Sequence, residues 1–180
     1  MSECEVPSLL FSDLIHLPYD EFSAKISIDQ ILRQLPDTPV EVAQQFYADH
    51  GRKEDFQSQY GHLQLRSIIW GNVKVLGSDL HDINIYSNFR NWFDSVGRRA
   101  EEYSELGWMG IDTRRAVQQH WEKFGTWDLS PILIDGSFVN SFSRMHLIEG
   151  HTRIGLLSGL IRCGVVPEDS KHSIWMGSSY

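Results

Sequence analysis

Residues 131–176 constrain the fold of this chain more than any other segment. Three short apolar runs there have the length and composition of buried strands: PILID at 131–135, MHLI at 145–148 and SIWM at 173–176. Between the second and third runs, Gly150 precedes apolar residues at helical spacing as far as Ile161, and Gly164 closes this helix. The order strand, helix, strand predicts a βαβ unit with a right-handed crossover, and therefore an α/β (α+β) fold.

The chain before residue 125 carries mainly helical patterns. We expect helices at 29–35, 38–51, 56–60 and 87–103, and one that begins after Asp112-Thr113 and ends at Gly125. Alternation over Lys25–Ile31 predicts a short strand, and 63–76 fits either a hairpin or a strand followed by a loop. We therefore expect a single domain, 1–180, with 1–124 as a helical extension or insertion and 125–180 as a small sheet with its βαβ unit.

Composition excludes several classes of protein. With 41% hydrophobic and 22% charged residues, the chain has the usage of an ordinary folded domain rather than a disordered one. Its longest apolar stretch, 154–161, is far below the length of a membrane span, and the N-terminus has acids where a secretory signal has bases. Cys4 and Cys163 are far apart and form no C-x-x-C motif. We expect a reduced, cytoplasmic protein that does not contact membranes.

Charge is unevenly distributed along the chain. The net charge is −8, which argues against nucleic-acid binding through bulk charge. Residues 1–60 hold 11 acidic and 4 basic side chains, whereas 61–180 hold 13 and 12. A phosphate site in the second part would face no large repulsive field, and the acidic first third has the charge to dock a basic protein partner.

The segment Glu149-Gly150-His151-Thr152-Arg153 is the strongest candidate site. A strand that turns through a glycine into a helix directs backbone N–H groups outward at the positive end of the helix dipole. Thr152 adds a hydroxyl, and Arg153 adds a planar guanidinium suited to phosphate oxygens. A purely structural interpretation is equally open: Thr152 caps the helix, Arg153 forms a surface ion pair, and Gly150 permits the turn.

The run HLIEGHTRIGLL at 146–157 resembles the signature strand, turn and helix of the ParB/sulfiredoxin superfamily. The SPILID run before it and the HSIWM run after it add to the likeness, which covers residues 125–180. In that superfamily the turn holds nucleotide phosphates. The resemblance therefore implies a nucleotide or another phosphorylated small molecule, with or without Mg²⁺, at Gly150, His151, Thr152 and Arg153.

Two departures from the superfamily limit the activities that we expect. His151 stands where sulfiredoxin has its reactive cysteine, which excludes sulfinic-acid repair by that route. No helix-turn-helix follows the turn in this sequence, so we expect no sequence-specific DNA binding of the ParB kind. Phosphoryl transfer or hydrolysis would need a base, for which Glu149, Asp135 and His151 are the candidates. Asp135 also fits a turn residue, and Glu149 an ion-pair partner.

The remaining polar residues favour structural roles. His146, His151 and His172 have no metal-ligand spacing, so we expect buried, hydrogen-bonded histidines and no metal site. Arg98-Arg99 and Arg114-Arg115 lie beside acidic residues, a pattern that predicts surface ion pairs. Trp121 and Trp127 belong to a series of tryptophans that we interpret as core anchors rather than a base-stacking platform.

Three hypotheses about function follow from the sequence. The first is a nucleotide- or phosphate-binding domain with its site at Gly150–Arg153. The second is a non-enzymatic immunity or antitoxin protein whose acidic surface neutralises a basic toxin. In the third, the turn is only a structural element, with Arg153 buried against Glu149.

Overall fold

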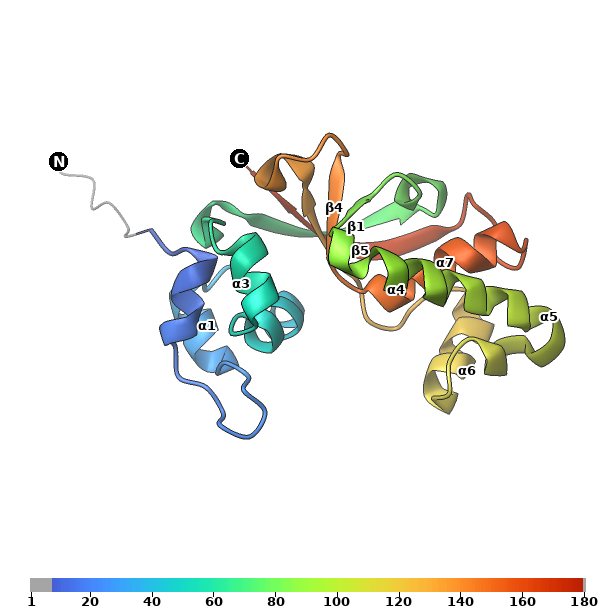
Figure 1. The fold of residues 1–180 in the computed structure, drawn as a ribbon, viewed down its shortest axis with the longest axis horizontal. Helices are drawn as coiled ribbons and strands as arrows, with labels where there is room; N and C mark the ends of the chain where they lie inside the picture. The colour runs from blue at the N-terminus through green and yellow to red at the C-terminus, as the bar shows by residue number, and fades with distance from the viewer. Residues whose placement is uncertain (1–7, 180) are drawn as a thin grey trace. The chain divides into compact units, whose positions relative to one another are not determined.

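A computed structural model describes residues 8–179, which divide into two compact units. The described residues up to Trp70, together with those from Gly177, form the N-terminal unit, and Gly71–Met176 form the sheet unit. The boundary thus falls at residues 70 and 71, whereas the sequence placed the change from helical extension to core at 124 and 125. Residues 1–7, which include Cys4 and part of the N-terminal stretch considered above, lie outside the described residues. Figure 1 traces the elements of both units.

The N-terminal unit is helical. Its elements are η1 (Phe11–His16), α1 (Ile28–Gln34), α2 (Val40–Val42), η2 (Ala43–Ala48), α3 (Glu54–Tyr60) and η3 (Leu65–Ser67). Aromatic rings form its core: the Phe11 and Phe46 rings stack with their centroids 4.9 Å apart, and Tyr60 meets Phe46 edge-on at 5.7 Å. The three helices predicted in this part are confirmed.

The strand predicted at Lys25–Ile31 is wrong. Ile26 alone forms a β-bridge, to Tyr19, and α1 begins two residues later at Ile28. Ser27 has extended backbone angles as the N-cap, and Asp29 lies in the first helical turn, where its charge favours the helix dipole. These local signals end the extended segment after one bridge.

The sheet is mixed and has five strands. They are β1 (Ile69–Leu76), β2 (Asn84–Ile85), β3 (Ile132–Asp135), β4 (Met145–Glu149) and β5 (Lys171–Ser178), in the order β1-β5-β3-β4-β2. β3 pairs antiparallel with β4, and β2 pairs parallel with it. The strands and the helix predicted in 131–176 are confirmed, and so is the mixed α/β class. β3 lies between β4 and β5, so the two strands of the predicted βαβ unit are not neighbours.

The hairpin considered for 63–76 is not formed. This segment contains the single turn of η3 followed by β1, so the alternative of one strand is the correct one. A second expectation, a helix over 87–103, is confirmed with an irregularity: α4 (Ser87–Arg98) continues through the 3₁₀ turn η5 (Arg99–Glu102) into α5 (Tyr103–Leu106).

Helices α4 and α7 (His151–Arg162) cross at close range in the sheet unit (Figure 1). The contact depends on glycine: a Cβ on Gly155 would lie 2.9 Å from the carbonyl oxygen of Phe93, and one on Gly159 would overlap the backbone of Gly97. α6 (Arg115–Phe124) follows the turn η6 (Gly107–Gly110) and ends at Gly125, whose φ is +63°. Shorter turns are η4 (Ser78–Leu80) and η7 (Gly136–Val139).

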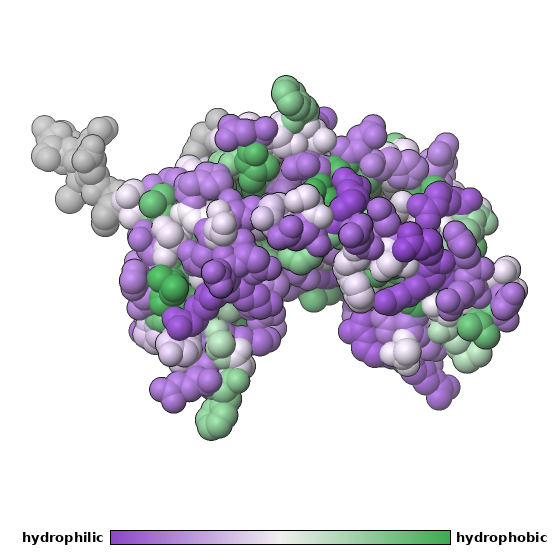
Figure 2. All heavy atoms as spheres, in the orientation of Figure 1, coloured by the Kyte–Doolittle hydropathy of each residue, from purple (hydrophilic) through white to green (hydrophobic). Residues whose placement is uncertain are grey.

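The core of the sheet unit joins α4, α6 and α7 to the strands. Its buried members come from all three helices, from the loop after α6 and from β3, β4 and β5, and they include Phe93, Trp121, Trp127, Leu133, Leu147, Leu157 and Ile174. Among the residues that the structure describes, no helix combines the length and apolar character that a membrane crossing needs. The face drawn in Figure 2 is mainly hydrophilic, with hydrophobic groups exposed singly or in small patches.

Candidate functional site

Gly150 makes the turn from β4 into α7 possible. Its φ of +101° belongs to the left-handed region, and a Cβ there would lie only 2.6 Å from Cβ of Pro131. Gly150 is the N-cap of a 12-residue helix, and no side chain forms a capping hydrogen bond. The interpretation of Thr152 as the cap is therefore wrong. By helix geometry, the first N–H groups of α7 have no partner within the helix.

Arg153 is held in place by two partners. Its Nη1 donates to the carbonyl oxygen of Leu129 at 2.6 Å, and its Nη2 lies 3.3 Å from Oε1 of Glu149. The side chain is 19% exposed, and burial lowers its pKa, while the carboxylates of Glu149 and Asp128 act in the opposite direction. The pairing of Arg153 with Glu149 that the sequence allowed is confirmed, and the hydrogen bond from Arg153 to Leu129 braces the loop before β3 against α7.

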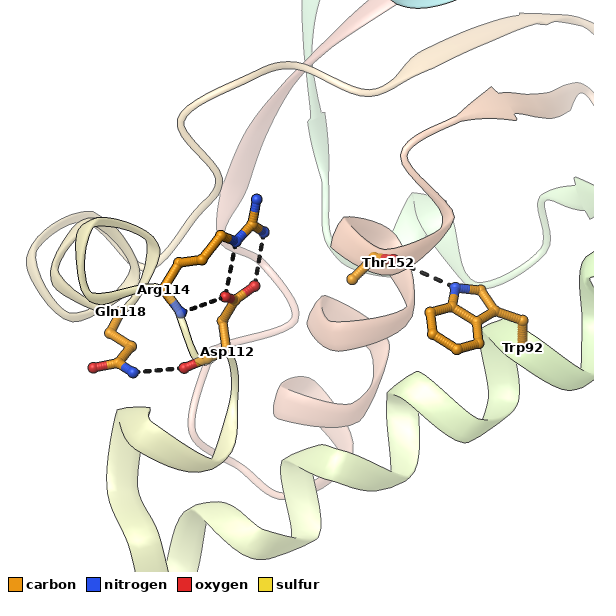
Figure 3. A network of polar contacts seen from close by, with 5 residues as sticks. All are labelled: Trp92, Asp112, Arg114, Gln118 and Thr152. Atoms are coloured by element: carbon orange, nitrogen blue, oxygen red, sulfur yellow. Dashed lines mark hydrogen bonds and ion pairs between the residues drawn. The ribbon is translucent and has the colours of Figure 1, made fainter. Parts of the chain in front are cut away.

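Thr152 faces α4. Its Oγ1 accepts a hydrogen bond from Nε1 of Trp92 at 3.4 Å, as Figure 3 shows. This hydrogen bond connects the first turn of α7 to α4 and orients the half-exposed Trp92 ring. Thr152 nevertheless lines the same surface hollow as Arg153.

His151 lies on the interior side of the turn. It is buried, and its ring centroid is 4.6 Å from that of Phe89 in α4. It is close enough to His146 to disfavour the charged form of that ring, and together with burial, the larger cause, this lowers the pKa of His146 to about 4. His151 is therefore not directed into the hollow that Thr152 and Arg153 line.

Asp135 is not close to the turn. It pairs with Met145 at the first residue of β4, whereas Ile132 pairs with Glu149 at the last, a separation along the strand of about 13 Å. Its carboxylate accepts the backbone N–H of Ser137 and caps η7. Hydrogen bonds from the side chain and from the backbone N–H of Ser137 hold its pKa below the usual value. The structure thus separates Asp135 from Glu149 and supports its interpretation as a turn residue.

A hollow of about 320 Å³ opens beside the first turn of α7. Four apolar side chains line part of it: Val117, Trp121, Trp127 and Leu156. The rest of the lining is mainly charged or polar: Asp112, Arg114, Asp128, Glu149, Thr152 and Arg153, with Leu129 between them. Its size and its mixture of aromatic and charged groups are typical of sites for small molecules.

Arg114 is the exposed guanidinium of this hollow. Its Nε and Nη2 donate to the two carboxylate oxygens of Asp112 at 2.9 and 2.8 Å, and its side chain is 71% exposed (Figure 3). These hydrogen bonds hold the pKa of Asp112 below its usual value. Gln118 of α6 donates to the carbonyl oxygen of Asp112 at 2.6 Å and fixes the segment before α6. The predicted ion pair is confirmed, but its place beside α7 was missed.

The charges of the hollow nearly balance. Arg114 and Arg153 face three carboxylates, those of Asp112, Asp128 and Glu149. No group of three or more His, Cys, Asp or Glu side chains in residues 8–179 is arranged to hold a metal ion. Mg²⁺ can still bind through one or two carboxylates when a phosphate supplies further oxygens.

The two other buried histidines have structural partners. His146 Nδ1 lies 2.7 Å from Nδ2 of Asn84, and His172 lies between Oγ1 of Thr126 at 2.9 Å and Oγ of Ser170 at 2.7 Å. Burial lowers the pKa of His172 to about 4. The expectation of buried, hydrogen-bonded histidines is confirmed for these two.

Comparisons with protein-family models, with curated proteins and with solved structures find no match to this chain. The resemblance of 146–157 to the ParB/sulfiredoxin superfamily therefore stays a prediction. The geometry of the hollow is the basis on which function can be argued.

Proposed function

We propose that the hollow beside the first turn of α7 binds a nucleotide or another phosphorylated small molecule. The observation that carries the proposal is the meeting of three features at one place: the helix N-terminus, two guanidinium groups and the partly exposed apolar side chains of Val117 and Leu129. The dipole and N–H groups of α7 favour an anion. Val117 and Leu129, which are partly exposed, unlike the buried Trp121 and Trp127, offer apolar surface for the remainder of the molecule.

The two arginines have different roles in this proposal. Arg153 already donates hydrogen bonds to the Leu129 carbonyl and the Glu149 carboxylate. In this proposal it therefore orients the turn and adds positive potential, but it does not form a bidentate contact with phosphate. Arg114 is exposed, and in the contacts described above its guanidinium pairs with Asp112 alone. It is therefore the group that turns toward phosphate oxygens.

The carboxylates favour a nucleotide that carries Mg²⁺. With three carboxylates and two guanidinium groups in the lining, a bare polyanion would meet a slightly unfavourable field. A magnesium-bound nucleotide reduces that repulsion, and Asp112 or Asp128 can contribute an oxygen to the ion. Glu149 is engaged by Arg153, and Asp135 is remote, so the geometry supports binding more directly than phosphoryl transfer.

A thermal-shift screen tests the proposal. Native protein and Arg114→Gln are heated with ATP, ADP, CTP or GTP, each with and without Mg²⁺. A nucleotide at 100 times its Kd stabilises the native chain by about 2.7 kcal/mol, a shift of several degrees. We expect one nucleotide to stabilise the native protein with Mg²⁺ and to have a much smaller effect on the variant. Equal shifts in both proteins, or none in either, would count against the site.

The acidic N-terminal unit supports a second candidate, an immunity or antitoxin protein. Seven carboxylates of this unit are exposed: Asp20, Glu21, Asp29, Asp37, Glu41, Glu54 and Asp55. Such a surface attracts a basic protein and gives an association rate that falls steeply with salt. Affinity purification from native cells at low and high salt tests this candidate, and the absence of a stoichiometric basic partner at low salt would reject it.

A further inference from the structure

A second and larger hollow, of about 830 Å³, lies in the sheet unit at the opposite end of the strands β3 and β4. Its apolar lining comes from three strands: Val73 and Val75 of β1, Met145 of β4, and Ile174 and Met176 of β5. This apolar surface continues from the core of the unit, against which Val75, Met145 and Met176 pack only partly buried. The hollow is thus an uncovered end of the core.

The two rims of this hollow carry side chains of different kinds. The loop before β4 contributes Phe142, which is fully exposed at 110%, and Arg144. The segment after β1 contributes the exposed carboxylates of Asp79 and Asp82. Asp79 also accepts the backbone N–H of Leu76 at 3.0 Å, so its position is fixed relative to β1. One rim of the apolar hollow therefore carries an exposed phenyl ring and a cation, and the other rim carries two anions.

We propose that this face is a dimer interface and that its occupant is a second copy of this chain. A two-fold axis that passes between the two rims would place Phe142 of each copy against the hollow of the other. Arg144 of one copy then meets Asp79 and Asp82 of the other. The arrangement is self-complementary in shape and in charge, and it removes a fully exposed phenyl ring from water.

The chemistry of the lining favours this occupant over a small ligand. A small molecule would fill the apolar floor but would leave Phe142 in water, and it would not use the opposite charges of the two rims. A second copy covers the ring and matches both charges with residues already present. The inference is independent of nucleotide binding, because the hollow beside α7 lies at the other end of β4.

Sedimentation equilibrium over a wide concentration range tests the dimer. The native chain is compared with Phe142→Ser and with Phe22→Ser, a matched control whose ring is 102% exposed in the N-terminal unit. We expect the native chain to dimerise, Phe142→Ser to raise the dissociation constant at least about tenfold, and Phe22→Ser to leave it unchanged. A native chain that is monomeric at every concentration, or equal effects of the two variants, would overturn the proposal.

Charge exchange tests the orientation of the two copies. Arg144→Asp and Asp82→Arg should each weaken the dimer, and the two substitutions together should restore it. Circular dichroism of each variant confirms that it is folded. Two weakened single variants with no recovery in the double variant would overturn this pairing. A monomeric native chain that an apolar small molecule stabilises would assign the hollow to a ligand instead.

Discussion

The two ends of the β3–β4 strand pair differ in how far neighbouring groups hold and cover their side chains. At the Glu149 end, Arg153 is braced by a carbonyl and a carboxylate, and Gly150 packs against Pro131. At the Met145 end, apolar surface is open, and the Phe142 ring is fully exposed. The first end has a rigid framework with one exposed cation, Arg114, and the second has an uncovered core.

The two ends therefore differ in which groups are available for binding. A charged side chain that already has two close partners is part of the architecture, even where a motif suggests a ligand. Arg153 is such a group, and Arg114, which the sequence placed in an ordinary surface pair, is more available.

The largest effect on stability is expected at Gly150. Alanine there would adopt an unfavourable positive φ and would bring its Cβ within 2.6 Å of Pro131. We expect Gly150→Ala to lower the free energy of unfolding by about 2–4 kcal/mol in urea titrations. Gly71→Ala is the matched control, because its nearest neighbour would be 3.8 Å away, and its effect should stay below about 1 kcal/mol. Similar effects at both positions would contradict the turn geometry.

Acid should destabilise the sheet unit through its buried histidines. The pKa of His146 and of His172 is lowered to about 4, so each is neutral in the folded protein while the unfolded chain takes up protons near pH 6.5. Stability is therefore full above pH 6.5 and falls between pH 6.5 and 4. We expect His146 to account for about 2–3 kcal/mol of this loss.

Thermal unfolding across this pH range measures that loss. His146→Gln should flatten the profile, whereas substitution of the exposed His81 by Gln should leave its slope unchanged. A slope that is the same in native protein and His146→Gln would show that the ring is not buried in its neutral form.

Removal of Arg153 should cost stability, and removal of Arg114 should not. Arg153→Met leaves the Leu129 carbonyl and the Glu149 carboxylate without this donor, which we expect to lower the free energy of unfolding by about 1–3 kcal/mol. Arg114→Gln breaks an ion pair whose arginine is 71% exposed, and its effect should be below about 0.5 kcal/mol. Equal losses of unfolding free energy for the two variants in urea titrations would contradict the distinction between a structural Arg153 and an available Arg114.

Local patterns predicted β3, β4, β5 and α7 of the sheet unit, but they did not predict the short strand β2. The runs at 131–135, 145–148 and 173–176 form β3, β4 and β5, and the glycine turn precedes α7, because each depends on neighbours in the chain. The position of β3 between β4 and β5 could not be predicted from spacing, since strand order is decided by packing between distant segments.

The candidate site was only half predictable for the same reason. Thr152 and Arg153 of the predicted turn line the hollow, but Arg114 and Trp127 reach it from segments 39 and 26 residues earlier than Arg153. No local motif marks such residues. His151 was misplaced because the residue after the glycine begins a helix whose first side chain points toward Phe89.

Calorimetric titration with a magnesium nucleotide measures binding at the hollow beside α7. Native protein, Arg114→Gln and Arg98→Gln, a control at an exposed arginine of α4, are titrated under identical conditions. We predict one bound nucleotide per native chain, an affinity at least about tenfold lower in Arg114→Gln, and no change in Arg98→Gln. Binding of equal strength in all three proteins, or no binding to the native chain, would contradict a nucleotide site beside α7.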